Sequence, residues 1–193
     1  HSTRVELLRV RGGVPWSVDS EHALDRPAAG QWGPVDADGV VIDARGRADA
    51  PALAVQTADC LPVVFSAASG QVVAAVHAGR RGLLGGILAR AAQRIRALVD
   101  GPIEALIGPA ICGRCYEVPA DMAAASEGLM PGIRGFTSWG TPALDLPHAA
   151  AASLTDLGVR VDIDERCTLE DSGLFSYRAD PSCGRQALVI IPA

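Results

Sequence analysis

The chain contains no lysine: all 17 of its lysine-or-arginine positions are arginine. This excludes mechanisms that need a lysine, such as a Schiff base, a lysine general base or the lysine of a phosphate-binding P-loop. Aromatic residues make up only 4% of the 193 residues, so the core must be built from aliphatic side chains. No apolar run approaches the roughly 18 residues that a membrane-spanning helix needs, and the sequence therefore predicts no such helix.

Positive charge is also in deficit, because 22 acidic residues give a net charge of -5. An acidic balance without a basic run argues against a nucleic acid or an anionic membrane as partner. The hydrophobic content of 49% against 20% charged residues excludes intrinsic disorder. We expect one folded domain over residues 1–193 that binds a small molecule, and the sequence carries no pattern that sets an oligomeric state.

Histidine and cysteine are scarce as well. The four histidines are too few for the imidazole-rich clusters of conventional multicopper oxidases, and they are His1, His22, His77 and His148. The five cysteines are an odd number, at positions 60, 112, 115, 167 and 183. Few and unpaired cysteines predict free thiols or metal ligands in a reducing, cytoplasmic compartment.

Hydrophobic patterning predicts an α/β fold. Strands are expected over residues 5–10, 39–42, 52–57, 62–66, 71–77, 103–107, 159–163 and 187–191. Helical spacing of apolar residues predicts helices over 81–99, 120–129 and 146–157. The alternation predicts a mixed β-sheet core flanked by helices, with three consecutive buried strands between residues 52 and 77. Residues 14–37 show no period and predict a long irregular segment.

Two side chains near predicted strand ends have metal-binding chemistry. Cys60 follows one strand directly, and His77 ends the next strand but one. Neighbouring strand ends can bring a thiolate and an imidazole together, and this donor pair suits zinc or copper. The alternative is a buried free cysteine and a hydrogen-bonded histidine, because two ligands alone do not define a metal site.

The turn after His77 predicts an anion site. Gly79 and Gly82 allow a tight backbone, and Arg81 opens the expected helix, where free N–H groups and the helix dipole favour an oxyanion or phosphate. The alternative is a solvated arginine. Asp36 and Asp38 run into a strand and could bring a carboxylate to the same site or form a polar turn.

Cys112 and Cys115 form a C-x-x-C motif in an expected loop. A four-cysteine zinc site would need a second close pair, and Cys167 and Cys183 are far apart in sequence. A thioredoxin-like motif would open a helix, whereas this one precedes the tetrapeptide YEVP at 116–119. The motif alone favours a structural or incidental role.

Two motifs carry a resemblance to a known family. Residues 57–63 (TADCLPV) and 77–82 (HAGRRG) resemble the signature of the polyphenol oxidase, laccase-domain family, also described as purine nucleoside phosphorylases. Further stretches resemble its central loop and C-terminal block, namely 107–111 (IGPAI), 115–118 (CYEV), 166–168 (RCT), 175–178 (FSYR) and 184–185 (GR). The likeness extends from about residue 36 to the end of the chain.

The resemblance implies a zinc site with two histidines and one cysteine, and copper is the other candidate metal. Cys60 and His77 match two of the ligands, and His1 matches the third, so the chain is expected to begin inside that motif. Three protein ligands leave one tetrahedral position open, as in catalytic zinc sites. The sequence departs from the family at Arg80, where tryptophan is usual, which replaces an aromatic ring with a cation.

The implied reaction is phosphorolysis of a purine nucleoside, with adenosine deamination and methylthioadenosine phosphorolysis as further activities. The candidate catalytic residues are Cys60, Asp38, Asp59 and Arg81. Arg81 would bind phosphate, and Asp38 or Asp59 would move a proton or contact the ribose. The residues expected to border the substrate are Phe175, Tyr177 and Arg178, together with Arg81. Alternatives are copper-dependent phenol oxidation, editing of peptidoglycan precursors, and a metal that only stabilises the fold.

Overall fold

The computed structural model describes residues 4–11, 14–17, 37–47 and 50–193. Seven strands form its central sheet: β1 (Arg4–Arg11), β2 (Val14–Ser17), β3 (Gly39–Asp43), β5 (Leu61–Ala67), β6 (Val72–Ala78), β7 (Ile103–Ile107) and β10 (Arg160–Ile163). They lie in the order β10-β7-β5-β6-β3-β1-β2, with β10 parallel to β7 and every other pair antiparallel. The predicted fold class, a mixed sheet flanked by helices, is confirmed.

Two further strand pairs and four helices complete the described part of the chain. The strands are β4 (Leu53–Thr57) with β11 (Gln186–Ile190), and β8 (Arg134–Phe136) with β9 (Pro142–Leu144). The helices are α1 (Arg80–Leu84), α2 (Ile87–Leu98), α3 (Ala120–Leu129) and α4 (Leu146–Asp156).

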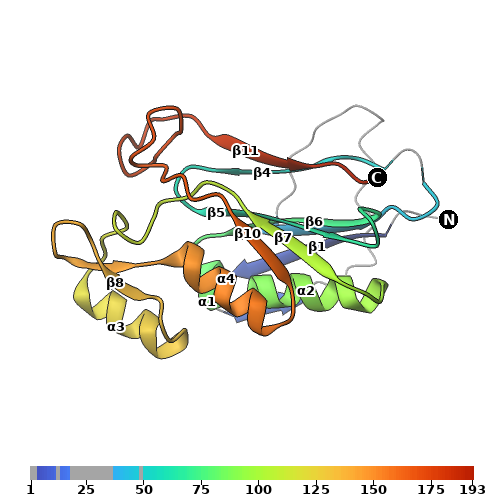
Figure 1. Cartoon of the computed structure of the whole chain (residues 1–193), viewed down its shortest axis with the longest axis horizontal. Helices are drawn as coiled ribbons and strands as arrows, with labels where there is room; N and C mark the ends of the chain where they lie inside the picture. The colour runs from blue at the N-terminus through green and yellow to red at the C-terminus, as the bar shows by residue number, and fades with distance from the viewer. Residues whose placement is uncertain (1–3, 12–13, 18–36, 48–49) are drawn as a thin grey trace.

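The elements stack in layers (Figure 1). The helices lie on one side of the central sheet, and the β4–β11 pair covers the other side. Helix α2 packs on β6, β3 and β1 through one apolar face that includes Ile87, Leu88 and Ile95. Strands β5 and β6 are buried along nearly their whole length, because a layer covers each of their faces.

Four details differ from the sequence prediction. The helix expected over 81–99 is two helices, because Gly86 adopts a φ of 77° that ends the continuous helical path before α2. Strand β4 is not part of the central sheet, and its outward-facing residues are exposed. Residues 14–17 form strand β2, whereas 18–36 lie outside the described residues. The short β8–β9 hairpin was not predicted.

One edge of the central sheet gathers chain segments that are far apart in sequence. Pro62 at the start of β5 lies opposite His77 near the end of β6, so Cys60 and His77 emerge at the same edge. The parallel pairing of Ile163 with Ile107 brings the ends of β10 and β7 to this edge as well. The loops that follow these strands therefore meet beside Cys60.

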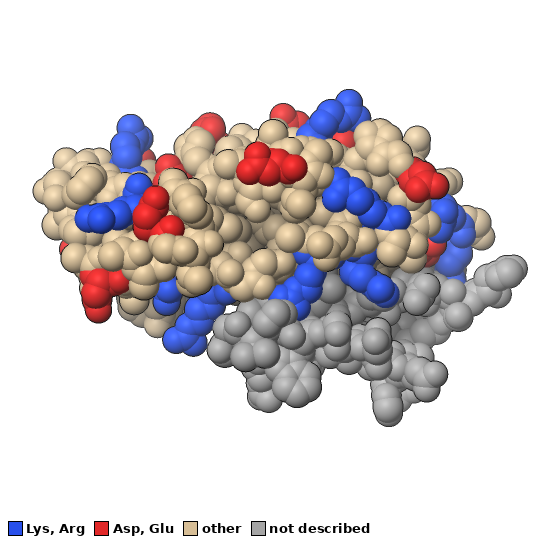
Figure 2. All heavy atoms as spheres, turned by 90° about the horizontal axis from the view of Figure 1, so that it is seen from below, with Lys and Arg blue, Asp and Glu red and all other residues tan. Residues whose placement is uncertain are grey.

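In the part of the chain that the structure describes, no helix is long and apolar enough to cross a membrane. Figure 2 shows the molecule from the helix side, and on the described part of this face arginines and carboxylates are interspersed. The expected lack of a nucleic-acid partner stays a prediction.

His148, in the first turn of α4, gives a pH-dependent contribution to stability. Its Nδ1 lies 2.9 Å from Asp145 Oδ2, and this hydrogen bond raises the pKa of His148 above the ordinary value of a histidine. Because the pKa of His148 is higher in the folded than in the unfolded protein, the hydrogen bond stabilises the fold fully at a pH below the pKa of the unfolded state. This stabilisation is lost as the pH rises through the pKa of the folded state. We expect His148→Gln to cost more unfolding free energy at about pH 5.5 than at about pH 9.

The expected difference is under about 1 kcal/mol, because the pair is largely exposed and therefore screened. Urea unfolding of both proteins at the two pH values measures it. Equal destabilisation at the two pH values would mean that the Asp145 contact contributes nothing through the charge of His148.

Candidate metal and substrate site

Cys60 and His77 converge on a space that Gly79 leaves open. A Cβ placed on Gly79 would lie 3.1 Å from Cys60 Sγ and 3.8 Å from His77 Nε2. The sulfur and the ring nitrogen therefore both face one small region, which any residue larger than glycine would fill. A thiolate and an imidazole are zinc and copper ligands, so the residues present fit the metal that the sequence predicts here.

Asp38 orients the His77 ring from the other side. His77 Nδ1 lies 3.6 Å from Asp38 Oδ1, and the backbone N–H of His77 donates to the Asp38 carbonyl at 2.7 Å. A carboxylate near Nδ1 favours the tautomer that carries its proton there, which leaves the Nε2 lone pair toward Cys60. Asp38 thus sits where a carboxylate supports a metal-ligating histidine.

Cys60 is half-buried and directly precedes β5. Burial raises the pKa of its thiol, and the charge of Asp59 raises that pKa further, whereas Arg185 lowers it. Without a bound cation the sulfur therefore stays protonated at neutral pH. A metal cation bound beside Cys60 would stabilise the thiolate form, which burial disfavours, and would lower the pKa of the thiol.

Asp59, a candidate catalytic residue, anchors the C-terminal loops. Its Oδ1 accepts a hydrogen bond from Thr168 Oγ1 at 2.7 Å, and its Oδ2 accepts one from the backbone N–H of Arg178 at 2.8 Å. Its backbone has a φ of 93°, a strained conformation for a residue with a side chain. This geometry suits a residue that positions Cys60 and the neighbouring loops. Its catalytic role stays a prediction.

A depression of about 420 Å³ adjoins the Cys60–His77 pair. Its lining comes from three parts of the chain and consists of Asp38, His77, Gly79, Arg80, Arg81, Gly82 and Tyr116. Two adjacent guanidinium groups give it the charge that an anion needs. Helix α1 begins at Arg80, one residue earlier than predicted, and has only five residues, so the arginine side chains matter more here than the helix dipole.

Tyr116 joins this depression to the C-terminal loop. The guanidinium of Arg178 lies 5.1 Å from the centre of the Tyr116 ring, in cation–π contact. Burial raises the pKa of Tyr116, against the opposing charges of Arg80 and Arg178, so its hydroxyl stays protonated. Sequence reasoning did not single out Tyr116, although it stands in the CYEV stretch that resembles the family's central loop.

The other predicted substrate residues lie nearby but are less enclosed. Phe175 and Tyr177 are exposed and do not line the depression among the described residues, whereas Arg178 reaches it through Tyr116. Arg185, which influences the Cys60 thiol and stacks 5.7 Å from the Tyr177 ring centre, was not predicted as a site residue. The roles of Phe175, Tyr177 and Arg178 stay predictions.

His1, the expected third ligand, lies outside the described residues, and so does His22. The structure therefore brings together Cys60, His77, Asp38 and Arg81 of the predicted set. His148 pairs with Asp145 and Glu165.

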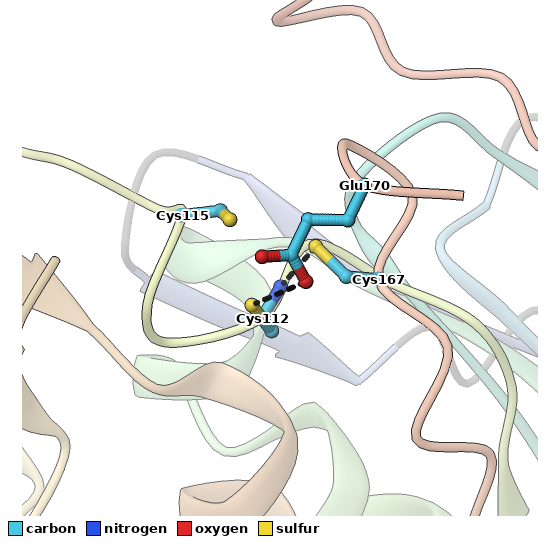
Figure 3. A group of neighbouring side chains, drawn as sticks. All are labelled: Cys112, Cys115, Cys167 and Glu170. Atoms are coloured by element: carbon cyan, nitrogen blue, oxygen red, sulfur yellow. Dashed lines mark hydrogen bonds between the residues drawn. The ribbon is translucent and has the colours of Figure 1, made fainter. Parts of the chain in front are cut away.

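A second group of metal-ligating side chains lies on the loops after β7 and β10. It consists of Cys112, Cys115, Cys167 and Glu170, whose ligand atoms all lie within 4.8 Å of one another (Figure 3). These residues could hold a metal ion. Burial raises the pKa of Cys112 and of Cys115, so both are thiols at neutral pH when no cation is bound.

Comparisons with curated sequences agree with the motifs. The chain is 46% identical over 176 residues to a Streptomyces griseus protein named purine nucleoside phosphorylase ORF3, covering 90% of this chain and 65% of that protein. It is 48% identical over 142 residues to a Mycobacterium tuberculosis protein named purine nucleoside phosphorylase, covering 72% of this chain and 57% of that protein. The chain thus spans about three fifths of the length of these relatives.

Solved structures share the fold. Geobacillus stearothermophilus YlmD superposes with a TM-score of 0.68 at 33% identity, covering 80% of this chain and 60% of that one. A Neisseria meningitidis protein superposes with a TM-score of 0.68 at 37% identity, covering 83% of this chain and 67% of that one. A sequence model described as multi-copper polyphenol oxidoreductase laccase matches residues 4–193. With its TADC and HAG motifs brought to one edge of the sheet, the chain belongs to this laccase-like family.

Proposed function

We propose that this chain is a metal-dependent purine nucleoside phosphorylase. The observation that carries the proposal is the convergence of Cys60 Sγ and His77 Nε2 beside a depression lined by Arg80 and Arg81. A pair of metal-ligating side chains next to two arginines that can bind an anion suits a reaction between a nucleoside and inorganic phosphate. The names of the Streptomyces and Mycobacterium relatives support the same activity.

Phosphorolysis breaks the bond between C1′ of the ribose and the purine nitrogen, and a phosphate oxygen forms the new bond to C1′. The products are the free purine and ribose 1-phosphate. Arg81 and Arg80 would hold the phosphate by charge-assisted hydrogen bonds and offset its charge as it approaches the sugar. Asp38, which also lines the depression, would offset the positive charge that develops on the ribose ring.

Cys60 and His77 would hold the metal, with His1 as the proposed third ligand. Zinc bound there would supply a Lewis acid that polarises a substrate oxygen or an attacking water. Asp38 keeps the His77 ring in the orientation that this role requires, and Asp59 fixes the Cys60 segment through Thr168 and Arg178. Adenosine deamination and methylthioadenosine phosphorolysis use the same pocket and belong to the proposal.

Incubation of the protein with inosine or adenosine, with and without phosphate, tests this function. We expect ribose 1-phosphate only when phosphate is present, and inosine from adenosine if deamination also occurs. Absence of every product with a fully metal-loaded protein would overturn the proposal. Parallel assays with a phenol and added copper test the oxidase activity that the family description suggests.

Arg81→Ala tests the anion site. Arg81 is exposed and its side chain lines the depression, so its loss should leave the fold intact. We expect the KM for phosphate to rise about tenfold, because one charge-assisted contact is lost, while the KM for inosine changes little. Arg134→Ala, which removes an arginine from β8, serves as the control. An unchanged KM for phosphate would remove Arg81 from the site.

A further inference from the structure

We propose that Cys112, Cys115, Cys167 and Glu170 bind a structural zinc ion, separate from the metal at Cys60 and His77. The proposal concerns a different set of ligands, so it does not depend on the proposed reaction. Figure 3 shows the three sulfur atoms and the Glu170 carboxylate pointing toward a common centre.

The fold brings these residues together through the parallel pairing of β7 and β10. Beyond the strand ends, Ala110 and Cys167 form an isolated parallel β-bridge. The backbone N–H of Thr168 donates to the Ala110 carbonyl at 3.0 Å. The two loops therefore run side by side, one with Cys112 and Cys115 and the other with Cys167 and Glu170. Such an arrangement, two ligands from each of two loops, is common in structural zinc sites.

The spacing of the ligand atoms fits a single ion. Tetrahedral zinc with Zn–S bonds of about 2.3 Å places its sulfur ligands about 3.8 Å apart. All four ligand atoms already lie within 4.8 Å of one another, so small side-chain adjustments complete the geometry. An iron–sulfur cluster would hold its thiolates further apart than this, and three thiolates with one carboxylate suit zinc.

The surroundings favour the charged ligands that zinc requires. The backbone N–H of Cys112 donates to Cys167 Sγ at 3.3 Å, an outer contact of the kind that orients metal-bound thiolates. Arg114, between the two cysteines of the motif, lies 3.8 Å from Glu170 Oε2 and offsets part of the negative charge. Cys115 and Cys167 are buried, whereas Glu170 is half-exposed and leaves a path for the ion.

The position of this zinc ion would let it stabilise the loops around the Cys60–His77 site. Cys115 directly precedes Tyr116, which lines the depression, and Cys167 directly precedes Thr168, whose hydroxyl donates to Asp59. Zinc binding would therefore fix both loops that shape the Cys60 segment. A disulfide between two of the cysteines would leave the third and Glu170 unused, and its formation requires an oxidant.

The metal content of the purified chain tests the site. We expect Cys112→Ser/Cys115→Ser to bind one zinc ion fewer per chain than the wild type and to have a lower Tm. Cys183→Ser, at the described cysteine that belongs neither to this group nor to the Cys60–His77 pair, should keep the wild-type content. An unchanged zinc content in the double variant would overturn the proposal.

A milder variant keeps the test valid if the double variant does not fold. Because Glu170 is half-exposed, Glu170→Ala should fold and should release one zinc ion to a chelator at least about tenfold faster. Glu165→Ala, at an exposed carboxylate on the same loop, should release zinc at the wild-type rate. Equal rates for the two variants would contradict the assignment of Glu170 as a ligand.

Alkylation followed by mass spectrometry gives the direct readout. Zinc should protect the half-buried Cys112 from iodoacetamide, and removal of zinc should make it reactive, whereas the buried Cys115 and Cys167 should react slowly in both states. A disulfide between any two of them in freshly purified protein, or alkylation of Cys112 that zinc does not slow, would overturn the proposal.

Discussion

Gly79→Ala is expected to abolish tight metal binding between Cys60 and His77 and to reduce phosphorolysis about 100-fold or more. The added Cβ would lie 3.1 Å from Cys60 Sγ and 3.7 Å from His77 Cε1, inside the space where the two ligands meet. The sulfur must therefore shift by a few tenths of an ångström, and the added methyl group occupies the space between the two ligands that the metal needs. Metal content and the rate of ribose 1-phosphate formation measure the two effects.

Gly82→Ala is the matched control, because it adds the same methyl group one helical turn away. Its Cβ would lie 3.6 Å from the His77 carbonyl oxygen and 3.7 Å from Ile87 Cγ2, which are ordinary contacts. Alanine also has a better helix propensity than glycine, by about 1 kcal/mol. We expect this variant to keep its metal. If the two alanine variants behaved alike, the space beside Gly79 would not be the ligand site.

Phe65→Ala should have the largest effect on stability, a loss of about 3–5 kcal/mol. Phe65 is fully buried in β5, opposite Ala74 on β6 and Ala105 on β7, so its removal leaves a cavity between small residues. Denaturant unfolding of the two proteins measures the difference.

Phe136→Ala makes the same chemical change at a phenylalanine that is 63% exposed. We expect it to cost less than about 1 kcal/mol, chiefly through its contact with Arg134. A similar loss of stability in the two variants would contradict the assignment of Phe65 to the core.

The sequence alone predicted the strands that hold Cys60 and His77, because buried strands are continuous apolar runs that end at turn residues. Ile103–Ile107 and Ala120–Leu129 form the predicted strand and helix with the predicted bounds. The neighbouring strand ends explain why the meeting of Cys60 and His77 could be predicted without a structure.

Other features depend on contacts between distant segments, which local patterns do not encode. The separation of Cys115 and Cys167 in sequence conceals that β7 and β10 are parallel neighbours, so the second metal-ligating group was missed. The hydrogen bonds from Thr168 and Arg178 to Asp59 arise in the same way. Strand β4 was assigned to the main sheet because periodicity shows burial but does not show which partner covers a strand.

Anomalous diffraction at the zinc absorption edge tests the central claim most directly, with crystals of the metal-loaded chain. The account predicts a peak about 2.3 Å from Cys60 Sγ and about 2.0–2.1 Å from His77 Nε2, on the side of Gly79. A chain that forms ribose 1-phosphate while this position shows no metal, or shows Cys60 and His77 turned away from each other, would contradict it.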